Sequence, residues 1–490
     1  MSRKPLEARI FLHQCRRTYS STPAQLYGRR FATAPKPQPQ LSHIRDNVEL
    51  HEHNVLVRNY RNLKDVPGKI AENVRAVNDL EDRMNKPRQT LRELQKQINT
   101  TKGDKSEFVT QMKTIRPVVD VLEAESAALD VEARELALSL PNLTFSQTPT
   151  DGAPRLKSYF NYDPANPPRH SNSADHAIIG EKLNLLDFAA AANSTGWGFY
   201  FLLNEAALLE QALVQYALSV TIKHGWSVVS PPSLVYSYLA DSCGFQPRDQ
   251  NDEQQIWEVA QLPRDQGKPM RSLAATAEIP LAGIYAGKTV PEGNLPIKLV
   301  GSSRCFRAEA GARGVDSKGL YRVHEFTKVE MFAWTDCPSS SAGVPDEDRW
   351  LEHSGKVFDE MVGIQTEILS SLGLPCRVLE MPSSDLGASA FRKIDIEAMF
   401  PSRRKRDDGW GEVTSASICT DYQSRRLNTR IAEKNLSTKK FPHTVNGTAI
   451  AIPRVLAAIL ENGWREDEGC VVIPEKLRVY MGGREKIGPR

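Results

Sequence analysis

The stretch that decides the fold runs from Arg307-Ala308-Glu309 to Arg322-Val323-His324-Glu325-Phe326 and closes at Glu330. Residues 320–334 are rich in Tyr, Val, Phe and Trp, which favour a pleated strand, and the glycines of residues 311–319 predict the preceding turn. We therefore expect an antiparallel hairpin in which Arg307 and Arg322 face one another. Paired guanidinium groups suit a polyphosphate and Phe326 offers a ring face for a base, so the hairpin predicts a nucleotide site.

A second interpretation of the hairpin is open at this point. Arg and Glu on neighbouring strands often form solvated ion pairs worth under about 1 kcal/mol, and a Phe in a strand is commonly part of the core. The hairpin alone does not separate a nucleotide site from a surface ladder. The choice between them depends on the rest of the chain.

Length and composition exclude several classes of protein. At 490 residues the chain exceeds one typical core, which predicts two folded units with tails. A formal charge of +3 does not demand nucleic acid, so any basic surface must be local. No apolar run approaches about 18 residues, so we expect no membrane span. The seven cysteines are scattered without a C-x-x-C pair, which argues against a disulfide framework or a zinc site and fits a reducing compartment.

The first 35 residues differ from the rest in composition. They contain seven Lys and Arg residues but only one acidic residue, Glu7, with Ser, Thr and apolar residues between them. This acid-poor, Arg-rich composition predicts a mitochondrial transit peptide, and a basic disordered tail is the alternative. The Pro- and Gln-rich residues 35–40 then form a spacer.

Residues 70–140 predict an antiparallel helical hairpin. Apolar residues recur every seven positions in both halves, on either side of a turn at residues 100–105. This narrow stripe predicts two helices of about 30 residues packed as a coiled-coil arm in solvent. We expect both helices to bend or loosen where Pro87 and Pro117 fall.

Basic residues gather in the distal half of this arm. Between residues 86 and 116 three acids oppose eight basic residues, which are Lys86, Arg88, Arg92, Lys96, Lys102, Lys105, Lys113 and Arg116. A solvated coiled coil normally intersperses its charges, so the segregation predicts contact with a polyanion such as a phosphate backbone. A basic face that is merely solvated is the alternative.

The rest of the chain predicts a connector and then a large α+β domain. Residues 144–169 are rich in Pro, Gly, Ser and Thr, and residues 170–490 mix helix-like and strand-like segments without an internal repeat. A helix over residues 206–224 leads to a strand that ends at Pro231-Pro232. The expected units are 1–35, 41–143, 144–169 and 170–490.

Three further elements offer polar groups with chemical use. Thr276-Ala277-Glu278 supplies a hydroxyl and a carboxylate in a turn-like segment, although the same pattern also begins helices. Residues 395–397 and 412–415 are strand-like runs whose carboxylates suit Mg²⁺ beside a phosphate, with surface acids as the alternative. In residues 446–454, small residues let a ligand approach the backbone and Arg454 leads a helix.

Taken in order, these elements resemble the signature motifs of class II aminoacyl-tRNA synthetases, and more narrowly of the seryl-tRNA synthetases. Residues 206–232 are similar to motif 1, residues 306–330 to motif 2 and residues 447–454 to motif 3. Residues 276–278, 412–415 and 477–483 resemble segments of the seryl branch. The resemblance spans residues 41–485. It implies an α+β catalytic domain built on an antiparallel sheet with flanking helices, plus the coiled-coil arm.

The resemblance implies a role for each matching residue. ATP binding would involve Arg307, Ala308, Glu309, Arg322, Val323, Phe326, Glu412, Val413, Thr414, Ser415 and Arg454. Serine binding would involve Thr276, Ala277, Glu278, Arg307, Glu330 and Thr448, and Mg²⁺ would be held by Glu412 and Ser415. The catalytic residues would be Arg307, Arg454 and Glu412, because positioning and charge neutralisation carry such a reaction without a covalent nucleophile.

The implied reaction is formation of seryl-adenylate from L-serine and ATP, followed by transfer of serine to the 3′ end of tRNA(Ser). The coiled coil would contact the variable arm of the tRNA, motif 1 would form a homodimer, and the transit peptide predicts the mitochondrial matrix. A catalytically inactive relative and a coiled-coil scaffold are the competing hypotheses. An inactive relative typically loses motif arginines or pocket acids, and all of these residues are present in this chain. A coiled-coil scaffold would account for residues 70–140 and leave the rest of the chain unexplained. The basic residues 402–408 have two interpretations, a loop that contacts tRNA and a loop that is only solvated.

Overall fold

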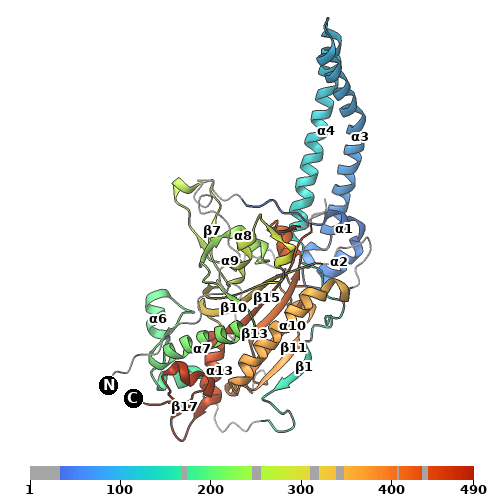
Figure 1. The fold of residues 1–490 in the computed structure, drawn as a ribbon. Helices are drawn as coiled ribbons and strands as arrows, with labels where there is room; N and C mark the ends of the chain where they lie inside the picture. Colours follow the sequence, from blue (N-terminus) through green and yellow to red (C-terminus); the bar gives the residue numbers. More distant parts are fainter. Residues whose placement is uncertain are drawn as a thin grey trace, which may run out of the picture. The chain divides into compact units, whose positions relative to one another are not determined.

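The computed structural model describes residues 34–167, 174–245, 255–309, 319–337, 347–404, 408–432 and 440–489. The predicted transit peptide, residues 1–35, therefore lies almost entirely outside the described residues. Within the described part, residues 34–490 form one compact unit, in which a run of helices is followed by a part that contains both strands and helices (Figure 1).

An eight-stranded sheet forms the centre of the fold. In spatial order its strands are β1 (Arg155–Phe160), β11 (Cys376–Glu380), β12 (Arg392–Met399), β13 (Trp410–Thr420), β15 (His443–Ala451), β10 (Glu325–Thr335), β9 (Ile297–Phe306) and β4 (Ser227–Val228). All neighbours pair antiparallel except β4, which pairs parallel with β9 at one edge. The expected α+β class with an antiparallel sheet is confirmed. The edge strand β1 comes from the segment expected to be a connector.

Strand β10 shows how the two faces of the sheet differ. Side chains alternate along a strand, so Val329 and Met331 point to one face and join the main hydrophobic core. Phe326, Lys328 and Glu330 point to the other face and line a cavity. The alternation thus separates a packed face from a polar face within one strand.

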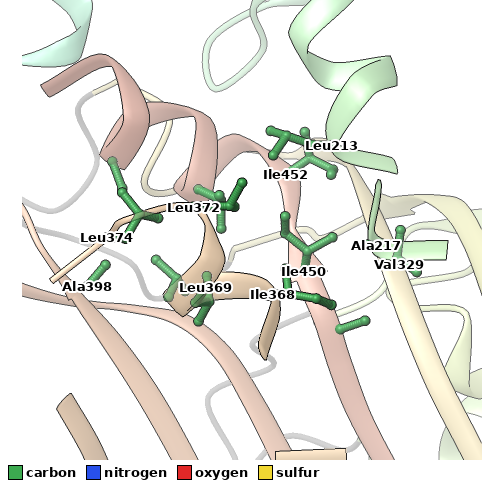
Figure 2. Close-up of a cluster of buried hydrophobic side chains, with 14 of the residues drawn as sticks. Leu213, Ala217, Val329, Ile368, Leu369, Leu372, Leu374, Ala398, Ile450 and Ile452 are labelled. Atoms are coloured by element: carbon green, nitrogen blue, oxygen red, sulfur yellow. The ribbon is translucent and has the colours of Figure 1, made fainter. Parts of the chain in front are cut away.

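Three helices cover the packed face. They are α7 (Asn204–Lys223), α10 (Glu347–Ser371) and α13 (Ile452–Gly463). Figure 2 shows Leu213 of α7 and Ile368 of α10 beside Val329 and Ile450 of the sheet, and all four side chains are buried. Burying a Leu or Ile side chain contributes about 1.5–3 kcal/mol, so this layer holds the sheet in place beneath the cavity.

The N-terminal part of the described chain consists of four helices, which are α1 (Leu41–Asp46), α2 (Val48–Val57), α3 (Val66–Thr100) and α4 (Ser106–Ser139). The last two lie side by side (Figure 1), with the turn between them where the sequence predicts it. Both continue through Pro87 and Pro117. Arg88 joins the two helices, because its guanidinium contacts Glu81 of α3 at 2.6 Å and Glu123 of α4 at 3.0 Å. The helical hairpin is confirmed, and its coiled-coil geometry stays a prediction.

The root of this hairpin packs on the main sheet through the buried Arg58 and the half-buried Asn142. Arg58, which follows α2, donates to the carbonyl oxygens of Asn142 at 2.9 Å and Ala390 at 2.8 Å. The Asn142 amide donates in turn to the carbonyl oxygens of Ser389 and Cys419, both at 2.9 Å. These bonds matter for the cavity because Ser389 and Ala390 are part of its wall.

The remaining elements are short. The helices are α5 (His176–Lys182), α6 (Phe188–Thr195), α8 (Ser237–Ser242), α9 (Glu278–Ala282), α12 (Tyr422–Arg426) and α14 (Glu475–Arg478). The small sheets contain β2 (Leu186–Asp187), β3 (Phe201–Leu202), β5 (Leu234–Tyr236), β6 (Glu258–Val259), β7 (Arg271–Leu273), β8 (Thr289–Pro291), β14 (Arg430–Ala432), β16 (Trp464–Arg465), β17 (Cys470–Val472) and β18 (Lys486–Ile487). Several of them frame the polar face of the main sheet.

Candidate functional site

A cavity of about 360 Å³ lies on the polar face of the sheet. Its wall includes Thr276, Glu278, Arg307, Glu309, Arg322, Val323, Phe326, Glu330, Glu412, Val413, Thr414, Ser415, Thr448 and Arg454. The structure therefore brings together residues that are up to 178 positions apart in the sequence. Among the described residues that the sequence predicts to bind ATP, serine or Mg²⁺, all except Ala277 and Ala308 line this wall.

The hairpin expected over residues 307–330 is shorter than the sequence predicts. The ladder between β9 and β10 ends at the pair Phe306 and Glu325, so the prediction that Arg307 and Arg322 face one another across two strands is wrong. The Arg307 N–H donates to the His324 carbonyl oxygen at 2.9 Å, so Arg307 lies opposite His324, whose own N–H donates to the carbonyl oxygen of Gly198, outside the hairpin, at 2.8 Å. Arg322 instead contacts Glu309 at 3.1 Å. The glycine-rich turn, residues 311–319, lies outside the described residues apart from Gly319.

Arg307 contributes its guanidinium group to the cavity wall. Its Cζ lies 5.3 Å from the centre of the Phe326 ring, a cation–π distance. Its buried Nε has no hydrogen-bond partner within the described part of the chain. A buried donor without a partner costs free energy, so this atom is available to an anionic or carbonyl oxygen of a ligand.

Glu330 closes one end of the cavity and is almost fully buried. Its Oε2 contacts the ammonium of Lys328 at 2.6 Å and accepts from the Thr448 hydroxyl at 3.2 Å. Both partners are placed by the sheet: Lys328 lies two residues earlier on the same face, and Thr448 lies opposite Glu330 in the register with β15. Lys328 was missed by the sequence analysis, although its spacing from Glu330 in a predicted strand was a usable signal.

Glu278 begins α9 and is buried against the same cavity. Its Oε1 accepts from Gln423 at 2.6 Å and from Asn446 at 2.9 Å. Burial, reinforced by the charge of Glu330, raises the pKa of Glu278 to about 7, with Lys328 opposing the shift. The carboxyl is therefore poised to ionise when a cation enters the cavity. Nothing in the sequence around Gln423 indicated this contact.

Glu412 and Arg454 face each other at the other end. Arg454 contacts the Glu412 carboxylate at 3.1 Å and donates to the Glu412 carbonyl at 3.1 Å. Although burial opposes ionisation, Arg454 and Lys393 hold the pKa of Glu412 well below its usual range. Lys393 lines the cavity and was also missed by the sequence analysis.

The other strand carboxylates proposed for Mg²⁺ are engaged elsewhere. Asp395 contacts Lys393 at 2.7 Å and Glu397 contacts Arg377 at 2.6 Å, and neither acid lines the cavity. The expectation that residues 395–397 join a metal site is therefore not met. Across the residues that the structure describes, no cluster of three or more His, Cys, Asp and Glu side chains is suited to a metal ion.

Cysteine chemistry plays no visible part in the cavity. Cys243 lines the wall, and burial raises the pKa of its thiol well above the usual value. Such a thiol is a poor nucleophile at neutral pH. Each of the six cysteines in the described ranges is free of disulfides. Among those same residues, no helix has the length and apolar character needed to cross a membrane.

The basic residues of the arm lie apart from the cavity wall. Lys86, Arg92, Lys96, Lys102, Lys113 and Arg116 are exposed, and Lys105 is half-buried. None of these seven makes an ion pair with a described residue, whereas Arg88 is held between two carboxylates. In the basic run 402–408, Arg403 lies 4.8 Å from the centre of the Tyr321 ring, and residues 405–407 are outside the described residues.

Comparison with known proteins agrees with this geometry. Residues 264–463 match the family described as the tRNA synthetase class II core domain (G, H, P, S and T). The chain is 40% identical over 451 residues to the mitochondrial serine–tRNA ligase of Saccharomyces cerevisiae, covering 92% of this chain and 93% of the relative. It is 36% identical over 445 residues to the mitochondrial serine–tRNA ligase of Schizosaccharomyces pombe, covering 90% and 87%.

A solved structure extends the comparison. The seryl-tRNA synthetase of Pyrococcus horikoshii, crystallised with ATP, is similar with a TM-score of 0.78 and 29% identity, covering 92% of this chain and 99% of that chain. The span matched by the class II core contains every residue predicted here to bind a small molecule.

Proposed function

Because the chain belongs to the seryl-tRNA synthetase family of class II aminoacyl-tRNA synthetases, we propose that it activates L-serine with ATP and transfers the serine to tRNA(Ser) in the mitochondrial matrix. The observation that carries this proposal is the convergence of the motif residues on one cavity. A cavity of about 360 Å³ whose wall carries Arg307, Arg322 and Arg454 together with several carboxylates suits a nucleotide and a small zwitterion.

The nucleotide would occupy the end formed by the motif 2 and motif 3 arginines. Adenine would stack on Phe326, with Arg454 on the opposite face of the base and in contact with the γ-phosphate. Arg307 and Arg322 would meet the phosphates, for which a planar guanidinium fork is suited. In the ligand-free protein Glu309 and Glu412 neutralise Arg322 and Arg454, at 3.1 Å in each pair. ATP would exchange these contacts for phosphate and base contacts.

Serine would occupy the end formed by Glu278, Glu330 and Thr448. Its ammonium would pair with the Glu278 carboxylate, and its hydroxyl would bond to Glu330 and Thr448. Alanine would leave those buried groups without a partner, which is how a polar pocket rejects a smaller analogue. The buried ion pair between Lys328 and Glu330, at 2.6 Å, supports this arrangement because it holds the carboxylate in one orientation.

Mg²⁺ would be held by Glu412 and Ser415 together with phosphate oxygens. A carboxylate kept ionised, with a hydroxyl beside it in the same wall, fits an ion that prefers few protein oxygens. When bound, the ion would supply charge neutralisation at the phosphates. The chain's own residues would orient the serine carboxylate toward the α-phosphorus. Attack there forms seryl-adenylate and releases pyrophosphate, with Arg307 stabilising the developing charge.

The helical arm would bind tRNA(Ser), and two chains would associate through motif 1. Exposed, unpaired basic residues on α3 and α4 support the first part, because a phosphate backbone is recognised by such charges. Apolar side chains exposed on α7 and β4, such as Leu208 at 49% and Val228 at 50%, support the second. Light scattering of the purified chain would distinguish a dimer from a monomer.

The decisive experiment is serine-dependent exchange of pyrophosphate into ATP, followed by charging of organellar and cytosolic serine tRNAs. The proposal requires exchange with serine and none with alanine. A properly folded chain that lacks exchange would refute it and favour the inactive relative. Import of the full-length chain into isolated mitochondria, with loss of its N-terminal segment, would test the location.

A further inference from the structure

A buried hydrogen-bond network adjoins the cavity, and Leu320, Tyr321 and Arg454 belong to both. His176 at the start of α5 is 2% exposed, and Glu461 near the end of α13 is 5% exposed. The Nδ1 of His176 lies 2.9 Å from Glu461 Oε1, and the backbone N–H of Leu320 donates to His176 Nε2 at 2.9 Å. Because Nε2 accepts a hydrogen bond, the ring is neutral and carries its proton on Nδ1.

This network holds both ends of Tyr321. The Tyr321 hydroxyl donates to Glu461 Oε1 at 3.0 Å, and the Tyr321 carbonyl accepts from Arg454 Nε at 3.1 Å. Arg454 and Glu461 are seven residues apart on α13, about two helical turns, so they share one face of the helix. Tyr321 is thus bonded to that face through its backbone at one point and its side chain at another.

The His176 ring packs closely against the segment from Gly319 to Tyr321. The His176 ring meets the Tyr321 ring edge-on with centroids 4.7 Å apart. At Gly319 an added Cβ would collide with the His176 ring, and the φ of +71° favours glycine. The segment from Gly319 to Tyr321 is therefore fixed by the imidazole, and it leads directly to Arg322 in the cavity wall.

We propose that His176 is a positioning residue for the nucleotide, which holds the segment from Gly319 to Tyr321 so that Arg322 and Arg454 meet the triphosphate. The inference rests on the proposed function of the cavity. Among the described residues, none of the four hydrogen bonds of this network reaches Glu278, Glu330 or Thr448, the groups proposed to bind serine. The role of His176 is therefore specific to ATP.

The test uses the full chain and steady-state ATP–pyrophosphate exchange with each substrate varied in turn. His176→Phe keeps a flat ring but removes both ring hydrogen bonds, and we expect the KM for ATP to rise roughly tenfold or more while the KM for serine stays unchanged. His176→Gln offers an acceptor and a donor on one carboxamide, so it recovers a measurable part of the loss.

Two further variants keep the test decisive. Tyr216→Phe removes a hydrogen bond between α7 and α10, where the Tyr216 hydroxyl lies 2.5 Å from Ser371 Oγ, and it leaves both KM values unchanged. Tyr321→Phe keeps the bond from Leu320 to His176 and raises the KM for ATP by a smaller factor, about threefold. If His176→Phe does not fold, Tyr321→Phe replaces it as the test of the proposal.

Three outcomes overturn the proposal. The first is an unchanged KM for ATP in folded His176→Phe, or in Tyr321→Phe if His176→Phe does not fold. The second is an equal rise of the KM for ATP and the KM for serine, and the third is a His176→Gln variant as impaired as His176→Phe. Absence of exchange in the wild-type chain is a separate result, since it refutes the proposed function before any variant is compared.

Discussion

The cavity and the helical arm both concentrate charge, yet they hold it in opposite ways. In the cavity the charged groups are placed by strands and paired at short range, as in Lys328 and Glu330 at 2.6 Å. On α3 and α4 most of the basic residues are exposed and have no ion-pair partner in the described part of the chain. Paired, buried charges define the geometry of a small ligand, whereas exposed charges bind a polyanion with strong dependence on salt. The two regions should therefore respond independently to mutation.

The largest expected effect comes from the cavity. Arg307→Ala removes the guanidinium that stacks on Phe326, and we expect serine-dependent exchange to fall about a thousandfold, because a developing phosphate charge loses its donor. Arg304→Ala is a matched control on the neighbouring strand, where Arg304 contacts Glu325 at 2.9 Å outside the cavity wall. Comparable loss in both variants would contradict the assignment.

The next effect is on stability and has a defined pH dependence. The pKa of Glu278 is about 7 in the folded chain against a usual 4.5, so between these values the folded state holds a proton that the unfolded state has released. The free energy of unfolding therefore falls as pH rises through this window. Glu278→Gln removes that loss and should stabilise the ligand-free chain at pH 8 by on the order of 3 kcal/mol, measured by urea unfolding.

Two comparisons check this expectation. The stabilisation by Glu278→Gln should disappear near pH 4.5, and the variant should lose serine binding at every pH. Glu330→Gln should instead destabilise the chain, because it leaves the buried ammonium of Lys328 without its partner at 2.6 Å. A Glu278→Gln curve parallel to that of the wild type between pH 5 and 8 would contradict the raised pKa.

A smaller effect is expected from the arm. Replacing Lys96, Lys102 and Lys105 by Ala should lower tRNA charging about tenfold at moderate salt and reduce the salt dependence of tRNA binding. Exchange should be unchanged, because none of the three lines the cavity. Filter binding at several salt concentrations gives the slope. Loss of exchange in this variant would break the separation between the two regions.

The smallest effect distinguishes two arginines of α3. Arg88 contacts Glu81 and Glu123 at 2.6 and 3.0 Å, so Arg88→Ala should slightly lower the temperature of thermal unfolding. Arg92 is exposed without such contacts among the described residues, so Arg92→Ala should leave thermal unfolding unchanged and weaken tRNA binding. Of the eight basic residues predicted to bind tRNA, Arg88 has the least support, because its guanidinium is already paired. Equal thermal stability of Arg88→Ala and Arg92→Ala would support tRNA binding by Arg88.

Much of the site followed from local sequence. Strand-forming residues around Phe326 and Glu330 placed both on one face because side chains alternate along a strand, and the small residues before Arg454 predicted the change from strand to helix. The same alternation would have identified Lys328 and Lys393 had it been applied to every polar residue in these strands. The sequence did not reveal that Arg307 lies opposite His324 rather than Arg322, nor that the His324 N–H donates to Gly198, which is far away in the sequence.

By itself the sequence determined the helical hairpin, the class of sheet and the types of residue at the cavity, since periodicity and side-chain chemistry are local properties. Only the tertiary structure decided which charges are paired, that Gln423 and Asn446 both bond to Glu278, and that His176 and Arg454 both contact Tyr321. These contacts join residues more than a hundred positions apart. Their energies depend on burial and on distance in space, which no local pattern of residues encodes.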